Sequence, residues 1–278
     1  MKAIWKRELT SLFHNVIAWL FLGVTLFLFG LYFFVYNLSY GYPYIAYSLS
    51  AISFIFLITV PVLTMRVLAE ERRARTDQLL LTSPVSVGKI VFGKFLALAT
   101  IYTISVLVIC IAPVVLLLFG EIPVLETYVA IFGFWLYGLA CIAIGEFVSS
   151  LTESQVISAV ITFALLFVGY MMQSITGLIS SSGNLLTRIL GCYDLLSPLE
   201  DLMSGSFSLT AVVYYLSLIG LCLFLTTQVI QKRRWTVSRK KISLSVFSVG
   251  TVAAGMAIVV ALNAGMAMLP ETWTSFDV

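Results

Sequence analysis

The segment MRVLAEERRARTDQLLLTSPVSVGKIVFGK, residues 65–94, decides how this chain is organised. It is the most charged part of a very apolar sequence, and long hydrophobic runs lie on both sides of it. A charged loop of this kind between two apolar runs is typical of a soluble segment held at a membrane face. We interpret it as a surface on which a separate protein docks.

The composition indicates an integral membrane protein. Of 278 residues, 60% are hydrophobic and 10% are charged, whereas soluble globular domains carry about 25% charged residues. The mean hydropathy is +1.06. Three of the four cysteines lie inside apolar runs and only Cys192 lies in a loop, so the sequence predicts no disulfide framework.

Seven apolar stretches come near the length of about 20 residues that a membrane-spanning helix needs. They are approximately Val16–Tyr36, Tyr44–Met65, Ile90–Phe119, Tyr128–Gly145, Val156–Ile179, Thr210–Ile230 and Leu244–Leu269. The Gly- and Pro-containing segment Asn37–Pro43 separates the first two, which predicts an antiparallel hairpin.

The N-terminal segment Met1–Asn15 is amphipathic. Trp5, Leu9 and Leu12 share one helical face, and Lys2 and Lys6 lie off it. This pattern predicts a helix lying in the membrane interface. The alternative is a simple extension of the first span.

The distribution of Lys and Arg predicts the orientation. With the N-terminus inside, fifteen of the sixteen basic residues fall on the inner side, and only Arg188 falls outside. Seven spans then place the N-terminus in the cytosol and the C-terminus outside it.

Two charged residues lie within apolar runs. Lys94 falls inside the third run, whose spare length lets the side chain snorkel to the interface, and Glu146 ends the fourth span in the same way. We expect both to be interface anchors, with a polar pathway through the membrane as the alternative.

Charge spacing predicts a helix in the loop. Glu70 and Arg73 are an i,i+3 pair, and Glu71 and Arg75 are an i,i+4 pair. The apolar residues Leu79–Leu81 follow. Beyond them, Pro84 ends the helix and Ser86 can cap the next one. The segment is either a solvated loop that maintains topology or a patch that binds a partner.

Two further segments lie outside the spans. Ser180–Leu209 predicts two short amphipathic helices over the outer mouth between the fifth and sixth spans, and its carboxylates (Asp194, Glu200 and Asp201) are typical of a solvated face rather than a cation site. Gln231–Lys241 is basic, which predicts a topology anchor with affinity for anionic lipid headgroups and no nucleic-acid binding.

Motifs for catalysis are absent from the sequence. It contains no G-x-x-x-x-G-K-[ST] phosphate loop, no H-E-x-x-H and no G-x-S-x-G, and its one histidine cannot build a multi-histidine metal site. The spans also lack the paired carboxylates of an ion-coupled carrier. The chain is therefore predicted to be no enzyme and to hold no metal or cofactor. Energy for any transport would come from another polypeptide.

Two motifs carry a family resemblance. EERRARTDQLLLTSPVS (Glu70–Ser86) and GEFVSSLTESQV (Gly145–Val156) resemble segments of ABC transporter permeases of the second export type, in particular the gliding-motility-associated branch. In the first motif, Arg75 stands where that family commonly has Gly. In the second, Glu146 replaces an apolar residue.

The resemblance implies a six-helix permease bundle that works as a dimer, with ATP and Mg bound by a separate ABC ATPase subunit. It implies ATPase coupling by residues of the charged loop: Glu70, Glu71, Arg72, Arg73, Thr76, Asp77, Leu79, Leu80 and Pro84. It also implies coupling through the interfacial helix, with Trp5, Leu9 and Leu12, and through a second cytosolic loop, with Ser149, Ser150, Thr152 and Gln155.

The expected organisation is therefore an all-α integral membrane protein of a bacterial plasma membrane. Its parts are the interfacial helix 1–15, the six-span domain 16–235 (coupling loop 66–89, external helices 180–209), and a basic linker with a seventh span, 236–278. The basic start of this last part, its single apolar run and the segment LPETWTSFD (Leu269–Asp277) resemble the start of the extracytoplasmic auxiliary protein of these permeases. The alternative there is an ordinary seventh span. For the whole chain the expected function is an ABC exporter permease, and the alternatives are a membrane scaffold of a surface or motility complex and a secondary carrier.

Overall fold

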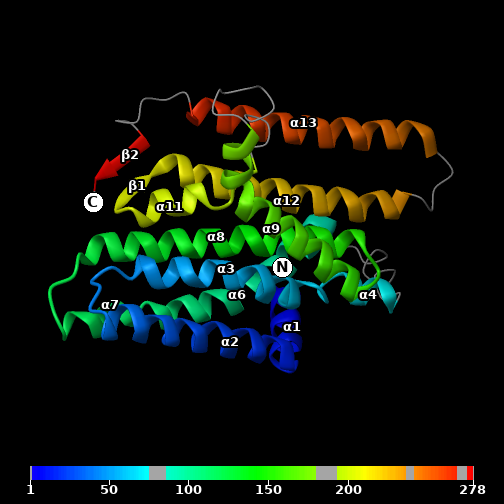
Figure 1. Ribbon diagram of the computed structural model, residues 1–278. Coiled ribbons are helices and arrows are strands. Elements are labelled where there is room, and N and C mark those ends of the chain that lie inside the picture. The colour runs from blue at the N-terminus through cyan, green and yellow to red at the C-terminus, as the bar shows by residue number, and fades with distance from the viewer. Residues whose placement is uncertain (1, 75–85, 180–192, 236–240, 268–273, 278) are drawn as a thin grey trace.

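The computed structural model describes residues 2–74, 86–179, 193–235, 241–267 and 274–277. Long helices run across the view of Figure 1, and the short helix α1 crosses their direction near one end. Six described helices are long and apolar enough to cross a membrane, which confirms the predicted all-α membrane bundle. The elements in chain order are α1 (Lys2–Phe13), α2 (Val16–Phe33), the π-helix η1 (Phe34–Ser39), α3 (Ala46–Thr64), α4 (Ala69–Arg73), α6 (Val87–Ile109), α7 (Ala112–Leu117), α8 (Val124–Leu151), α9 (Gln155–Ile179), α11 (Ser197–Met203), β1 (Ser206–Ser208), α12 (Leu209–Trp235), α13 (Lys241–Ala267) and β2 (Ser275–Asp277).

The third apolar run differs from its prediction as one continuous helix. It begins at Val87 and breaks between Ile109 and Ala112, so that α6 and α7 are separate helices. Pro113 lies in the first turn of α7. Proline lacks an amide hydrogen, and its ring clashes with the carbonyl four residues earlier, which is the last residue of α6. The proline therefore accounts for the break.

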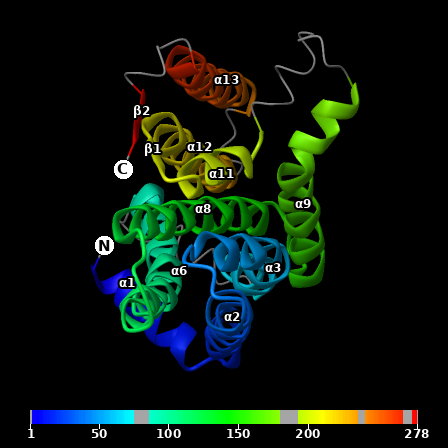
Figure 2. The same ribbon diagram turned by 60° about the vertical axis from the view of Figure 1, so that its left-hand side comes forward.

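Helix α8 lies at the centre of the bundle and is the most buried of the six long helices. It packs against α3, α6, α9, α11 and α12 (Figure 2). An aromatic cluster fills the interior: the Phe56 and Phe134 rings are 5.0 Å apart, and the Tyr102 hydroxyl donates to the Phe134 carbonyl at 2.6 Å. Gly138 lets Tyr102 approach α8, because a Cβ at Gly138 would overlap the tyrosine ring.

The segment before α12 folds back against the long helices. Leu195 N donates to Gly169 O at 3.1 Å, and the Tyr215 hydroxyl donates to Leu195 O at 2.8 Å. Gly169 lies ten residues before the end of α9, so this contact is about 15 Å from that end at 1.5 Å per residue. Helix α11 corresponds to the second predicted external helix, and the first, around Leu185–Leu190, lies outside the described residues.

Asp194 belongs to this folded-back segment. Its carboxylate accepts hydrogen bonds from Leu196 N and from Ser197 N and Oγ at 2.5–3.2 Å, at the start of α11. Burial raises the pKa of Glu200 and of Asp201, with the charge of Asp194 adding to the effect. In the described part of the chain, no group of three His, Cys, Asp or Glu side chains is arranged to hold a metal ion.

The C-terminal part adds one helix and one strand. Helix α13 runs beside α12 (Figure 1), and Asn263 Nδ2 donates to Ser217 Oγ at 3.0 Å. Strand β2 pairs antiparallel with β1, with Phe276 opposite Phe207, a pairing that the sequence did not predict. The described apolar part of α13, Ala253–Met266, is shorter than the roughly 20 residues of a full span. The seventh span therefore stays a prediction.

Candidate functional site

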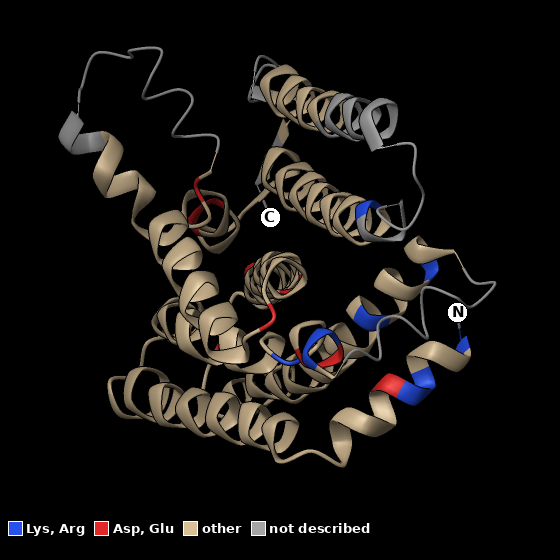
Figure 3. Cartoon of the chain, turned by 90° about the vertical axis from the view of Figure 1, so that its right-hand side faces the viewer, with Lys and Arg blue, Asp and Glu red and all other residues tan. Residues whose placement is uncertain are grey.

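Charged residues from three parts of the chain meet at the end of the bundle that carries α1 and α4. Figure 3 looks at this end and shows Lys and Arg on α1 and on neighbouring helices, whereas most of each long helix is uncharged. Helix α1 packs across α6. Trp5 Nε1 donates to Thr100 Oγ1 at 3.0 Å, and Gly93 leaves room for Ile4. Leu9 and Leu12 pack against the core, so the apolar face of α1 contacts the protein.

Lys94 is the centre of the site. Its side chain is 1% exposed, and its ammonium lies 2.7 Å from Glu71 Oε1 and 3.4 Å from Glu8 Oε2. It also donates to Val67 O at 3.2 Å. The prediction that Lys94 snorkels to the interface is therefore wrong. Two carboxylates, one from α1 and one from α4, satisfy the charge inside the protein, as a buried ammonium requires.

Glu8 joins two cations. It accepts a hydrogen bond from Arg7 at 2.7 Å, and it is also the α1 partner of Lys94. The hydrogen bond to Glu8 raises the pKa of Arg7. Glu8 is not among the site residues predicted from the sequence. The available signal was an acidic residue on the apolar face of an amphipathic helix, one turn after Trp5 and one turn before Leu12.

A second ion pair lies beside the first. Arg66 forms two hydrogen bonds of 2.8 Å to the carboxylate of Glu70, and a third of 3.2 Å to Asn15 Oδ1. The predicted pairing of Glu70 with Arg73 is therefore wrong, because the two-pronged Arg66 contact takes the carboxylate. Glu71 pairs with the buried Lys94, and its expected partner Arg75 lies outside the described residues.

The peptide between Val67 and Leu68 is held from two sides. Lys94 of α6 donates to its carbonyl at 3.2 Å, and its amide donates to Ser149 Oγ of α8 at 3.1 Å. The Ala69 amide donates to the same hydroxyl at 3.1 Å. The start of α4 is thus bonded directly to two long apolar helices rather than being a free loop.

Arg72 connects α4 to the turn between α8 and α9. Its guanidinium donates to Leu151 O at 2.7 Å and lies 3.2 Å from Glu153 Oε1. The Arg72 side chain is 19% exposed, whereas the side chain of its partner Glu153 is 71% exposed. A displacement of α4 would therefore pull on the turn that joins the end of α8 to the start of α9.

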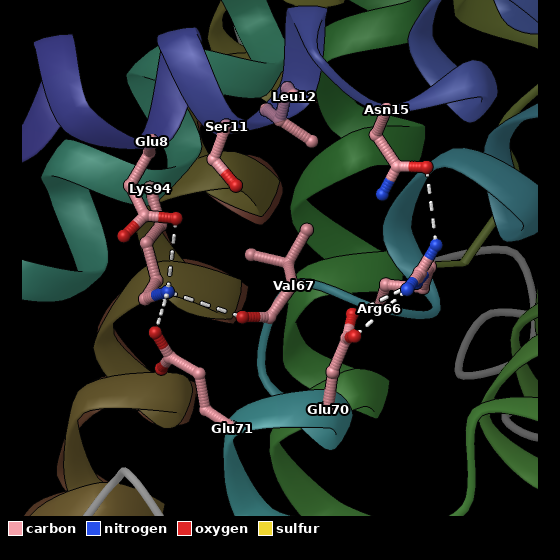
Figure 4. Close-up of a pocket in the computed structure, with 9 residues that line it drawn as sticks. All are labelled: Glu8, Ser11, Leu12, Asn15, Arg66, Val67, Glu70, Glu71 and Lys94. Carbon is pink, nitrogen blue, oxygen red and sulfur yellow. Dashed lines mark hydrogen bonds and ion pairs between the residues drawn. The ribbon is translucent and has the colours of Figure 1, made fainter. Parts of the chain in front are cut away.

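The two ion pairs line a cavity of about 220 Å³ (Figure 4). Its residues come from α1, from the turn between α1 and α2, from the turn before α4, from α4 and from α6: Glu8, Ser11, Leu12, Asn15, Arg66, Val67, Glu70, Glu71 and Lys94. Figure 4 shows the α1 side chains pointing toward the Arg66 and Lys94 pairs. These charges are already paired with one another, so the arrangement fits a mechanical junction between helices better than a catalytic centre.

Some of the other predicted site residues lie in the described part of the chain and some do not. Arg73 is exposed at the end of α4. Five residues of the predicted coupling set lie outside the described residues, namely Thr76, Asp77, Leu79, Leu80 and Pro84. The predicted helix of the loop is described only over Ala69–Arg73, and Ser86 is the N-cap residue of α6 without a side-chain cap bond.

The predicted second cytosolic loop is shorter than expected, because α8 continues to Leu151. Ser149 and Ser150 are buried helical residues, Thr152 is the C-cap of α8, and Gln155 begins α9. Ser149 bonds the amides before α4, and Ser150 Oγ donates to Phe147 O. Two of the four predicted loop residues are thus part of the central helix.

Glu146 lies one turn before Ser149 on α8 and is fully buried. Neither of its carboxylate oxygens has a hydrogen-bond partner among the described residues. The prediction of an interface anchor is therefore wrong, because the extended α8 carries this residue into the bundle.

One family model matches most of the chain. It is described as ABC-2 family transporter protein and matches residues 31–229. That range includes α3, α4, α6, α8 and α9, but not α1 or α13. A search of curated proteins gives no match.

Proposed function

The chain belongs to the ABC-2 transporter family, and from that premise we propose that it is the permease subunit of an ATP-driven exporter. Members of this family are membrane components that work with a separate ATPase subunit. This chain would form the transmembrane path, while the partner binds ATP and Mg and hydrolyses the nucleotide. The absence of a phosphate loop from the sequence agrees with this division of labour.

The observation that carries the proposal is the attachment of α4 to the long helices. The ion pairs of Lys94 connect α1 and α4 to α6. A hydrogen bond to Ser149 connects the start of α4 to α8, and the hydrogen bond of Arg72 connects α4 to the turn between α8 and α9. A force applied to α4 by a docked ATPase would therefore reach three apolar helices directly. A loop that only maintained topology would have no need of the buried polar contacts made by Lys94 and Ser149.

The ATPase-facing surface would consist of α4, the following residues 75–85 and the exposed side of α1. This end of the bundle would face the cytosol of a bacterial cell, following the distribution of basic residues. Two permease copies, or two related chains, would form the complete path. The gliding-motility-associated branch and the auxiliary-like C-terminus also belong to this proposal, and the sequence motifs of residues 70–86, 145–156 and 269–277 support them.

The test is co-purification of the ATPase with charge-reversed variants. Arg73 is exposed and forms no hydrogen bond or ion pair within the described chain, so Arg73→Glu should leave the fold intact. We expect about tenfold less ATPase to be retained, because a charge is reversed at the contact. The matched control is Lys232→Glu, an exposed cation at the end of α12, which should retain the ATPase.

Two results would count against the proposal, and they differ. Full ATPase retention by Arg73→Glu and by Leu79→Asp would overturn the placement of the docking surface. If the unaltered chain retained no ABC ATPase from its native membrane, the permease function itself would be wrong.

A further inference from the structure

A continuous row of tyrosine rings lies at the end of the first hairpin, which is the end of the bundle away from α4 (Figure 1). Neighbouring rings in the order Tyr32, Tyr36, Tyr40, Tyr42 and Tyr47 have centroids 6.1, 6.5, 6.3 and 5.5 Å apart. These spacings fall within the range of favourable aromatic contacts. We call these five residues the tyrosine row.

The outer part of the row is open. Tyr40, Tyr42 and Tyr47 are 70%, 48% and 56% exposed. The hydroxyls of the row form no hydrogen bonds within the described chain, whereas those of the buried Tyr102 and Tyr215 each donate to a backbone carbonyl. The row therefore presents ring faces and free hydroxyls together.

The backbone beneath the row is held in place. Asn37 is buried within η1, and its amide nitrogen donates to Tyr42 O at 2.8 Å and to Tyr44 O at 3.2 Å. Its side-chain oxygen accepts a hydrogen bond from Ser48 Oγ at 2.7 Å. A surface fixed in this way loses little conformational entropy when a ligand binds.

An aromatic belt at the membrane interface would place such rings on many helix ends. Here the distribution is uneven. Five tyrosines of the chain are exposed, and four of them lie on this hairpin: Tyr40, Tyr42, Tyr44 and Tyr47. Tyr128, at the start of α8, is the fifth. The concentration on one hairpin points to a localised binding surface.

The charge of the hairpin restricts the ligand. No Lys, Arg, Asp, Glu or His occurs between Val16 and Met65. An ionic headgroup would find no counter-ion there, whereas a neutral hydroxylated ring can stack on tyrosine faces and exchange hydrogen bonds with their hydroxyls. Exposed apolar side chains of α2, such as Phe27 and Leu31, continue toward the middle of the span, where an acyl chain can lie.

We propose that the tyrosine row binds the neutral sugar headgroup of a membrane glycolipid. The proposal stands independently of the ATPase partner, because it concerns the opposite end of the bundle. Stacking supplies most of the affinity and the hydroxyls select for a sugar.

The test is saturation-transfer-difference NMR on the full chain in phosphatidylcholine nanodiscs, with octyl β-D-glucoside below its critical micelle concentration as the probe. Saturation of the aromatic protons should reach the sugar-ring protons. We expect about tenfold weaker binding in the variant Tyr40→Leu/Tyr42→Leu/Tyr47→Leu, which removes the exposed stacking faces. The matched control, Tyr128→Leu, should bind as the unaltered chain does.

A Tyr→Phe variant at the same three positions separates the two contributions, and it should bind with intermediate affinity. If the Leu variant does not fold, Tyr40→Leu alone, at the most exposed of the three positions, replaces it. The proposal is overturned if an octyl chain with an ethylene glycol headgroup shows equal transfer to its headgroup, which would indicate an ordinary interfacial belt. Unchanged sugar transfer in the Leu variants would also overturn it.

Discussion

Replacement of Lys94 by Met tests the charge centre of the site. Methionine preserves the length and most of the apolar volume of the side chain while removing the ammonium. Glu8 and Glu71 would then lose their shared cation, with side chains only 16% and 21% exposed. Removing one partner of a fully buried ion pair typically costs about 3–5 kcal/mol.

The cost at this site should be at the low end of that range. Both carboxylates retain partial access to water, and Glu8 keeps its contact with Arg7. We therefore expect a loss of about 2–3 kcal/mol, which corresponds to a melting temperature lowered by about 5–10 °C.

Thermal unfolding of the purified chain in nanodiscs measures this difference. The triple variant Lys94→Met/Glu8→Gln/Glu71→Gln also removes the two carboxylate charges that face Lys94 and should recover most of the loss, because the charges of a buried ion pair can often be replaced together without penalty. The control is Lys89→Met, an exposed lysine of the same helix, which should melt as the unaltered chain does. A Lys94→Met melting temperature equal to that of the Lys89→Met variant would refute the assignment, as would a triple variant no more stable than the single one.

Two further substitutions test the interior. Glu146→Leu removes a buried carboxyl group that has no hydrogen-bond partner in the described part of the chain. Thermal unfolding should therefore show equal or greater stability, by up to about 3 kcal/mol, and a loss of more than about 1 kcal/mol would show that Glu146 has a stabilising partner. Gly169→Leu places a side chain where even a Cβ lies 2.7 Å from Leu195 Cδ1, so it should destabilise by about 1–3 kcal/mol, whereas Gly220→Leu, which has open space, should not. Equal effects of the two glycine substitutions would argue against the fold of the segment before α12.

The long helices were predictable because each is a local property of the sequence. An apolar run of sufficient length forms a helix in a membrane whatever its neighbours are, since its backbone must satisfy its own hydrogen bonds. The break at Pro113 had a local signal too, but the length of the run concealed it. The family match over residues 31–229 agrees with the permease resemblance of the two motifs.

The ion pairs of the site were not predictable in the same way, because they join distant segments. The local spacing of charges predicted an ion pair between Glu70 and Arg73. The Glu70 carboxylate instead accepts two hydrogen bonds from Arg66, which lies four residues before it. Lys94 was predicted to be an interface anchor because the third apolar run is longer than a span and leaves room for the side chain to snorkel. Its partners, Glu8 and Glu71, meet it only when α1 packs across α6.

The long-range contacts of the central helix α8 were not predictable either, because they depend on where the helix ends. Its predicted end at Gly145 would have left Glu146 and Ser149 at the membrane surface. The continuation of α8 to Leu151 instead buries both of them, and Ser149 becomes a bridge to the start of α4. The exact end of a helix depends on such tertiary contacts, which a single sequence does not display.

The most direct test of the account is affinity purification of the chain from its native membrane in mild detergent, with quantitative mass spectrometry of the proteins that accompany it. We expect an ABC-type ATPase at about one copy per permease chain, lost or strongly reduced in the Arg73→Glu and Leu79→Asp variants. Retention of the oligomer without any ATPase would contradict the proposed function, and it would leave the charged segment 65–94 as a device that maintains membrane topology.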